Sequence, residues 1–170
     1  VHNGIIENHD SIKSMLQNHG VTFYSDTDTE VLLNLITWEK NHHHCTTEEA
    51  ILKALQQVEG AYAIALLDRE TPNKIYAARQ FSPLIISTGE EGFFIASDRL
   101  ALDDRCSEIV YLEDQKMAVL ERDKPLAIYN NDGSSSAYQF QPLTHTEQVI
   151  SKGSFPHFML KEIHEQAKTI

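Results

Sequence analysis

Apolar residues recur three and four positions apart through much of the first 60 residues of the chain, which is the spacing of one face of an α-helix. Asn8 can cap the first of these segments, and Gly20 ends it. The other two segments each open on a Thr that is followed three residues later by Glu, at Thr27 and Thr46, which is the capping-box pattern. The pattern predicts three helices, over about residues 9–19, 28–40 and 47–59.

From Ala61 onward, short apolar runs separated by Gly, Pro and Asn replace the helical spacing, and runs of this kind are typical of β-strands. We predict strands over residues 61–68, 74–79, 84–87, 92–96, 109–112, 117–121 and 126–129. The earlier run Val21–Tyr24 also predicts a strand, residues 97–102 a short helix, and residues 155–166 a last helix. Helices followed by strands indicate an α+β fold, and 170 residues suit one domain with a sizeable core.

The opening residues 1–8 predict the end of a buried strand, because Val1, Ile5 and Ile6 are apolar and β-branched. Asn3 and Gly4 interrupt this run, so we expect the chain to turn there. A turn is one interpretation of the pair. The other is a pair of neutral hydrogen-bond donors, since Gly lets its backbone N–H approach a ligand and Asn adds an amide N–H.

The charge balance narrows the possible partners. The chain has 14 Lys and Arg against 25 Asp and Glu, a net charge of −11 with neutral histidines, which argues against nucleic acid and anionic membranes as partners. The sequence contains no apolar run long enough to span a bilayer and no signal-peptide pattern. Cys45 and Cys106 provide no disulfide framework. We therefore expect a cytoplasmic protein.

Several short motifs, in matching order and spacing, resemble the class II glutamine amidotransferases of the N-terminal-nucleophile hydrolase superfamily. They are Val1–Asn8, Ser25–Val31, Gly60–Ala63, Ala78–Leu84, Phe94–Asp98 and Met159–Gln166. The resemblance implies a four-layer αββα sandwich and the hydrolysis of glutamine by a thiolate. It is closest to the members that pass the ammonia to fructose 6-phosphate and form glucosamine 6-phosphate and glutamate.

The resemblance also assigns roles to site residues. Asn3 and Gly4 match the oxyanion hole, Asp28 matches the residue that binds the α-amino group of L-glutamine, and Gly4 also contacts the substrate. A carboxylate suits an ammonium ligand, although Asp28 can equally stabilise the first turn of its helix. No cofactor and no metal site are expected.

Other candidate residues are interpreted as structural. The family uses the α-amine of its N-terminal Cys as the base, so His2 is expected to pack beside the site. Neither Cys45 nor Cys106 lies on a matching motif, and no nucleophile is expected in this chain. The tract at residues 42–45, His-His-His-Cys, is interpreted as a solvated helix end. The segment Arg79–Leu84 is expected to place a strand and turn behind the site.

The match also sets expectations for the rest of the protein. The family's Cys precedes the residue equivalent to Val1, so we expect a missing N-terminal segment, an incomplete sheet and no glutaminase activity from this chain alone. We expect a glutaminase domain at residues 1–142 and, at residues 143–170, a linker and exit helix toward missing sugar-isomerase domains. Unpaired strand edges suggest a homo-oligomer. The alternatives are a phosphoribosylamine- or asparagine-forming amidotransferase and a non-catalytic binding module.

Overall fold

The computed structural model describes residues 1–102, 105–143 and 154–169. Within these residues the chain forms helices and two antiparallel sheets. The helices are α1 (His9–Asn18), α2 (Asp28–His43), α3 (Thr47–Leu55) and α4 (Phe158–Thr169), with a 3-10 helix, η1, at Arg99–Ala101. The larger sheet contains, in spatial order, β1 (His2–Ile6), β2 (Gly60–Leu67), β3 (Lys74–Gln80), β7 (Lys116–Glu121) and β8 (Ala127–Asn130). The smaller sheet contains β5 (Gly92–Ala96), β4 (Ile85–Gly89), β6 (Cys106–Tyr111) and β9 (Gln141–Pro142).

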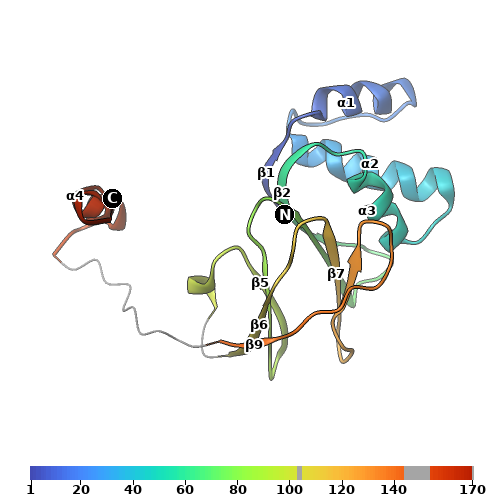
Figure 1. The fold of residues 1–170 in the computed structure, drawn as a ribbon. Helices are drawn as coiled ribbons and strands as arrows, with labels where there is room; N and C mark the ends of the chain where they lie inside the picture. Colours follow the sequence, from blue (N-terminus) through green and yellow to red (C-terminus); the bar gives the residue numbers. More distant parts are fainter. Residues whose placement is uncertain (103–104, 144–153, 170) are drawn as a thin grey trace.

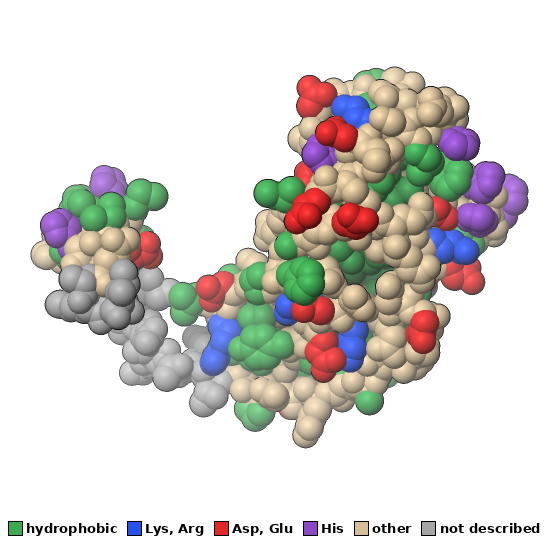
Figure 2. All heavy atoms as spheres, turned by 45° about the horizontal axis from the view of Figure 1, so that its top comes forward, with side chains coloured by type: hydrophobic (Ala, Val, Ile, Leu, Met, Phe, Trp, Pro, Cys, Tyr) green, Lys and Arg blue, Asp and Glu red, His purple; other side chains and the backbone are tan. Residues whose placement is uncertain are grey.

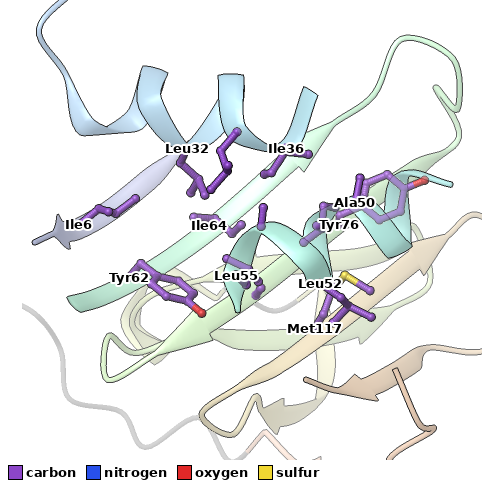
Figure 3. Close-up of a cluster of buried hydrophobic side chains, with 14 of the residues drawn as sticks. Ile6, Leu32, Ile36, Ala50, Leu52, Leu55, Tyr62, Ile64, Tyr76 and Met117 are labelled. Atoms are coloured by element: carbon purple, nitrogen blue, oxygen red, sulfur yellow. The ribbon is translucent and has the colours of Figure 1, made fainter. Parts of the chain in front are cut away.

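Three hydrophobic clusters show how these elements stack. Side chains of α1, α2 and α3 pack on one face of the larger sheet, and Figure 3 shows part of this cluster, with Leu32 and Leu55 directed toward Ile64 and Tyr62 of β2. The opposite face of the larger sheet packs on the smaller sheet. A third cluster lies around Ile85 of the smaller sheet. Figure 1 shows the same order, with α1–α3 gathered on one side of the sheets.

The predicted α+β class and the antiparallel pairing of the strands are confirmed. Strand bounds differ from the prediction by at most three residues, and residues 97–102 contain only the single turn of η1. The last helix lies three residues later than predicted. Ten residues of the predicted linker, 144–153, lie outside the described part of the chain.

The prediction for the first residues is wrong in two respects. β1 runs straight through Asn3 and Gly4 and pairs continuously with β2, and the chain turns only at Glu7 and Asn8. β1 is also an edge strand, so only its last residue, Ile6, is buried. Gly4 makes the continuous strand possible, because its φ of +117° keeps the backbone extended in a conformation that side chains oppose.

The strand predicted at Val21–Tyr24 is also wrong. No strand of the described chain lies beside it, so its backbone groups bond elsewhere: Val21 N–H donates to Leu16 O, and Tyr24 N–H donates to the Glu30 carboxylate. The segment is a loop that leads into α2. A β-branched and aromatic run makes a strand only where a neighbouring strand can pair with it.

The helix ends refine the predicted caps. α3 has the complete capping box, whereas at α2 the Thr27 side chain accepts the Glu30 N–H but the Glu30 carboxylate reaches further back into the loop. Asn8 makes no side-chain bond to α1. Its amide instead bonds to Gln57 O and Glu59 N, and so fastens the start of α1 to the turn before β2.

Candidate functional site

The open edge of β1 presents backbone groups that β2 does not use. Val1 exchanges two backbone hydrogen bonds with Ala65, of 2.8 and 3.0 Å, and Glu7 N–H donates to Glu59 O at 2.9 Å. In an antiparallel pair such bonds alternate along the strand, so the odd-numbered residues of β1 face β2. The N–H groups of Gly4 and Ile6 therefore point to the open edge.

Gly4 occupies a position in which a side chain would not fit. A Cβ at this position would lie 2.0 Å from Ala61 O, an atom of the β2 backbone. The missing side chain lets β1 lie close against β2, while the Gly4 N–H faces the opposite, open edge. The geometry therefore leaves a backbone donor that an external acceptor can approach.

Asp28 lies at the same open edge. It is the first residue of α2, and its Oδ2 accepts the Ile6 N–H at 2.9 Å, while its side chain remains 22% exposed. A carboxylate has about four acceptor sites, so this bond leaves capacity for a further donor. Since Gly4 and Ile6 are two residues apart in an extended strand, their N–H groups lie roughly 7 Å apart. An anionic acceptor and a neutral donor thus stand at neighbouring points along one edge.

His2 packs beneath this pair. Its side chain is 3% exposed, its Nδ1 lies 3.0 Å from Thr29 Oγ1 and 3.8 Å from Asp28 Oδ1, and its buried Nε2 has no partner among the described residues. Burial lowers the pKa of His2, although the Asp28 charge opposes the shift. The imidazole is therefore neutral at pH 7 and supports the first turn of α2, in agreement with the predicted packing role.

The Asn3 side chain lies on the other face of β1. Asn3 pairs with Ala63, which belongs to the cluster between the two sheets, so both side chains lie on the face that looks toward the smaller sheet. Asn3 is exposed there. The site thus combines one amide on the inter-sheet face with the Gly4 N–H and the Asp28 carboxylate at the open edge.

Both cysteines lie away from these residues. Cys45 follows the C-terminal end of α2, a helix of 16 residues whose first residue is Asp28, and a helix of that length spans roughly 24 Å. Its thiol contacts Glu39 O at 3.7 Å. Cys106 is buried at the start of β6 in the third hydrophobic cluster. Neither thiol meets Asn3, Gly4 or Asp28.

The histidine tract lies at the exposed end of α2, as predicted. The His42 ring stacks on Trp38 at 4.6 Å, and His43 Nε2 lies 3.2 Å from the Glu39 carboxylate. Figure 2 shows exposed histidine side chains gathered at this edge of the molecule. Among the described residues, no group of three or more His, Cys, Asp or Glu side chains could hold a metal ion.

Some of the surrounding contacts had no signal in the sequence. The capping pattern at Thr27 indicates that Thr29 belongs to a helix but gives no reason to place it against His2. The bond between Asp28 and Ile6 joins residues 22 positions apart. Only the tertiary packing of α2 against β1 brings these groups together.

Comparison with known proteins adds an independent line of evidence. A family model described as "Glutamine amidotransferase domain" matches residues 1–104. The chain is 43% identical over 170 residues to the glutamine–fructose-6-phosphate aminotransferase (isomerizing) of Bacteroides thetaiotaomicron, covering all of this chain and 28% of the relative. It is 39% identical over 170 residues to the enzyme of the same name from Clostridium tetani, covering 27% of that protein. The chain thus spans little more than a quarter of these curated relatives.

Two solved structures share the fold. One is the glutamine phosphoribosylpyrophosphate amidotransferase of Bacillus subtilis complexed with ADP and GMP, with a TM-score of 0.62 and 26% identity over 85% of this chain and 29% of the other. The second is described as the allosteric regulatory enzyme of purine biosynthesis, with a TM-score of 0.58, 27% identity, and coverage of 85% of this chain and 28% of the other. No described helix is long and apolar enough to cross a membrane.

Proposed function

The chain belongs to the family of glutamine amidotransferase domains, and we propose that it forms the part of such a domain that binds glutamine and stabilises its oxyanion. The observation that carries this proposal is the open edge of β1. There the strand, through the bond from Ile6 N–H to Asp28, holds a backbone donor at Gly4 and a carboxylate at neighbouring points along one edge.

The proposed reaction is hydrolysis of the side-chain amide of glutamine. A thiolate, which in this family belongs to an N-terminal Cys, attacks the carbonyl carbon, and the carbonyl electron pair moves to the oxygen. The Gly4 N–H and the Asn3 amide donate to this developing negative charge. The α-amine of that Cys, which has taken the thiol proton, returns the proton to the departing nitrogen, so that collapse of the intermediate expels ammonia and leaves a thioester. Water then hydrolyses the thioester to glutamate and restores the thiol.

Asp28 has a different role in the proposal. The α-amino group of glutamine is an ammonium ion, and the Asp28 carboxylate accepts its hydrogen bonds. The same carboxylate holds the Ile6 N–H, so the strand fixes the distance between the ammonium and the oxyanion donors. An extended glutamine side chain can bridge a gap of roughly 7 Å between two groups on one strand.

For the complete protein we propose glutamine–fructose-6-phosphate aminotransferase activity. The identity of 38–43% over the full chain to enzymes of that name supports this substrate over the phosphoribosylamine- or asparagine-forming alternatives. In the proposal, residues outside this chain supply the nucleophile and bind fructose 6-phosphate, and the protein is a cytoplasmic homo-oligomer with residues 143–170 as the exit from its glutaminase domain.

We also propose that the complete domain is a four-layer αββα sandwich. The cluster around Ile85, Cys106 and Ile109 of the smaller sheet supports a further layer, because it leaves Phe94 and Ala96 only partly buried. Strands from the N-terminal segment would complete the sheets in this arrangement.

The experiment compares two variants of the complete enzyme. Asn3→Ala removes a donor that acts on the transition state, so kcat should fall about a hundred- to a thousandfold while KM for glutamine changes little. Asp28→Asn keeps the shape and the helix end but removes the charge, so KM should rise strongly, corresponding to about 2–5 kcal/mol for a buried pair.

The kinetic results of these variants distinguish the proposed roles of Asn3 and Asp28 from the alternatives. An unchanged KM in Asp28→Asn would leave Asp28 with a structural role only, because the Asn amide oxygen can still accept the Ile6 N–H. Equal KM effects of both variants would contradict the division of roles. Absence of glutamine hydrolysis in the complete protein would favour the non-catalytic binding module.

A further inference from the structure

Arg79 and Asp114 join two of the connections by which the chain passes between the sheets. Residues 81–84 lead from β3 to β4, and residues 112–115 lead from β6 to β7. Arg79 Nη1 donates to Leu112 O at 3.0 Å, and its Nη2 lies 2.7 Å from Asp114 Oδ1. The Arg79 side chain is only 18% exposed. Its planar guanidinium therefore holds the second connection through two directed bonds.

Asp114 holds the first connection in turn. Its Oδ1 accepts the Phe81 N–H at 2.8 Å, and Gln115 N–H donates to Arg79 O at 3.0 Å. Phe81 is a non-glycine residue with φ of +60° and a side chain that is 69% exposed. A left-handed backbone at an aromatic residue persists only where its surroundings enforce it. Here the bond to Asp114, a bridge to Tyr62 and the Ser82 N–H bond to Gln80 O surround this residue.

We call the Arg79–Asp114 pair, with its bonds to Leu112 O and Phe81 N–H, the clasp. Two routes of direct backbone pairing connect the clasp to the candidate site. Asn3 pairs with Ala63, and Ala63 pairs with Arg79, so all three side chains lie in one row on the inter-sheet face. On the neighbouring row, Gly4 pairs with Tyr62, and Tyr62 forms a bridge with Phe81.

The charge of Asp114 also affects the pKa of Tyr62. Its pKa is raised to about 12, mainly by burial and further by the negative charge of Asp114. A single residue of β2 thus lies between each oxyanion residue and the clasp. Ala63 lies between Asn3 and Arg79, and Tyr62 lies between Gly4 and Phe81.

From this arrangement we propose that Arg79, through its pair with Asp114, is a positioning residue that fixes Asn3 and Gly4 for transition-state stabilisation. The inference rests on the proposed glutaminase function and adds a residue that touches no substrate. Adjacent strands are about 4.8 Å apart, so Arg79 lies two strands, about 10 Å, from Asn3. The clasp acts by holding β2 and the two connections in register behind the donors.

The expected fall in kcat follows from how strongly transition-state stabilisation depends on the position of the donors. A misplacement of 1 Å by a change remote from the reacting atoms can cost about a hundredfold in rate. Loss of the clasp relaxes two connections while the continuous β1–β2–β3 pairing remains, so we expect a smaller effect, a fall in kcat of about tenfold. KM for glutamine should change less than twofold, since Asp28 is held separately by α2 and Ile6.

The test uses the complete enzyme with Arg79→Gln and a matched control at the other end of the same strand. Lys74 begins β3 and pairs with Glu48 at 2.8 Å, with a side-chain exposure of 24% that is close to that of Arg79. Lys74→Gln therefore removes a comparable ion pair from the same strand, far from Asn3. We expect Arg79→Gln to lower kcat about tenfold and Lys74→Gln to leave kcat within twofold, at similar losses in melting temperature.

Conservative variants provide the second readout. Arg79→Lys keeps the charge but replaces the planar guanidinium, whose two nitrogens bond to Leu112 O and Asp114, with a single nitrogen on a flexible stem, so its kcat should lie between those of the wild type and Arg79→Gln. Asp114→Asn should lower kcat like Arg79→Gln. If Arg79→Gln does not fold, the kcat values of Arg79→Lys and Asp114→Asn decide the question.

Equal effects of Arg79→Gln and Lys74→Gln on kcat would overturn the positioning role. So would a rise in KM for glutamine with kcat unchanged. Those results are distinct from failure of the proposed function, which would appear as no glutamine hydrolysis in the wild-type enzyme.

Discussion

Gly4 has no Cβ, and both the pairing of β1 with β2 and the candidate oxyanion donor depend on that absence. Its φ of +117° is unfavourable for any side chain, and a Cβ would also collide with Ala61 O. These two costs can be separated, because Gly92 has a similar φ of +122° but nothing lies within 4 Å of the position its Cβ would take. The chain thus contains its own control.

We predict that Gly4→Ala destabilises the 170-residue chain more than Gly92→Ala. Both variants carry the cost of a positive φ, and Gly4→Ala adds a steric clash with backbone that should cost about 1–3 kcal/mol more. Urea unfolding of the two variants measures the difference. Equal losses would mean that β1 shifts away from β2 without cost, and that the close approach at Ala61 is not required.

At the scale of elements, the loop before α2 determines where Asp28 stands. The Glu30 carboxylate accepts bonds from Tyr24 N–H, Ser25 N–H and Ser25 Oγ, and the Ser25 and Tyr24 bonds lower its pKa. Glu49 has the matching position in α3, where its carboxylate bonds to Thr46. The two glutamates perform the same structural task at two different helices.

We predict that Glu30→Ala and Glu49→Ala both lower the melting temperature, but that only Glu30→Ala raises KM for glutamine severalfold in the complete enzyme. The reason is that Glu30 orders the loop adjoining Asp28, whereas Glu49 acts on α3. Steady-state kinetics of the two variants test this. A KM effect of similar size in Glu49→Ala would trace the change to general loosening of the helical layer.

The same elements show how far the sequence could predict the structure. The capping patterns at Thr27 and Thr46 and the apolar spacing located all three early helices, because these signals are local. Asn3–Gly4 also has the local signature of a turn, yet pairing with β2 overrides it. Asp28 was found as a candidate from its motif, whereas its bond to Ile6 and its approach to His2 depend on how α2 packs against β1. Such contacts between distant residues leave no periodic pattern.

At the scale of the whole molecule, Asp68 ties the helical layer to the larger sheet. It follows β2, and its carboxylate accepts bonds from Lys40 of α2 and Thr47 of α3. Burial alone would raise the pKa of Asp68, but the bonds from Lys40 and Thr47 outweigh it and lower the pKa to about 2. Three elements therefore depend on one ionised carboxylate.

We predict that this carboxylate makes the chain acid-sensitive. The pKa is lower in the folded state than the ordinary value of 3.8, so its contribution is complete above about pH 4 and is lost as the pH falls through about 2. The shift corresponds to a contribution on the order of 2 kcal/mol. In urea unfolding, Asp68→Asn should reduce stability at pH 7 and weaken the dependence on pH between about 4 and 2.

Asp26→Asn is the control for this prediction, because Asp26 pairs with Lys13 on the surface and its side chain is fully exposed. Its replacement should leave both the stability and the pH dependence nearly unchanged. The assignment to Asp68 would be wrong if Asp68→Asn kept the acid sensitivity of the wild-type chain.

The free edge of β1 also has a consequence for how this protein can change over generations. The Gly4 donor is a main-chain N–H, so among single substitutions only Pro deletes it. Any other residue keeps the N–H but adds a Cβ where Ala61 O leaves no room. Selection for this donor should therefore act on position 4 by retaining Gly, whereas the neighbouring Ile5, whose side chain is exposed, can be replaced more freely.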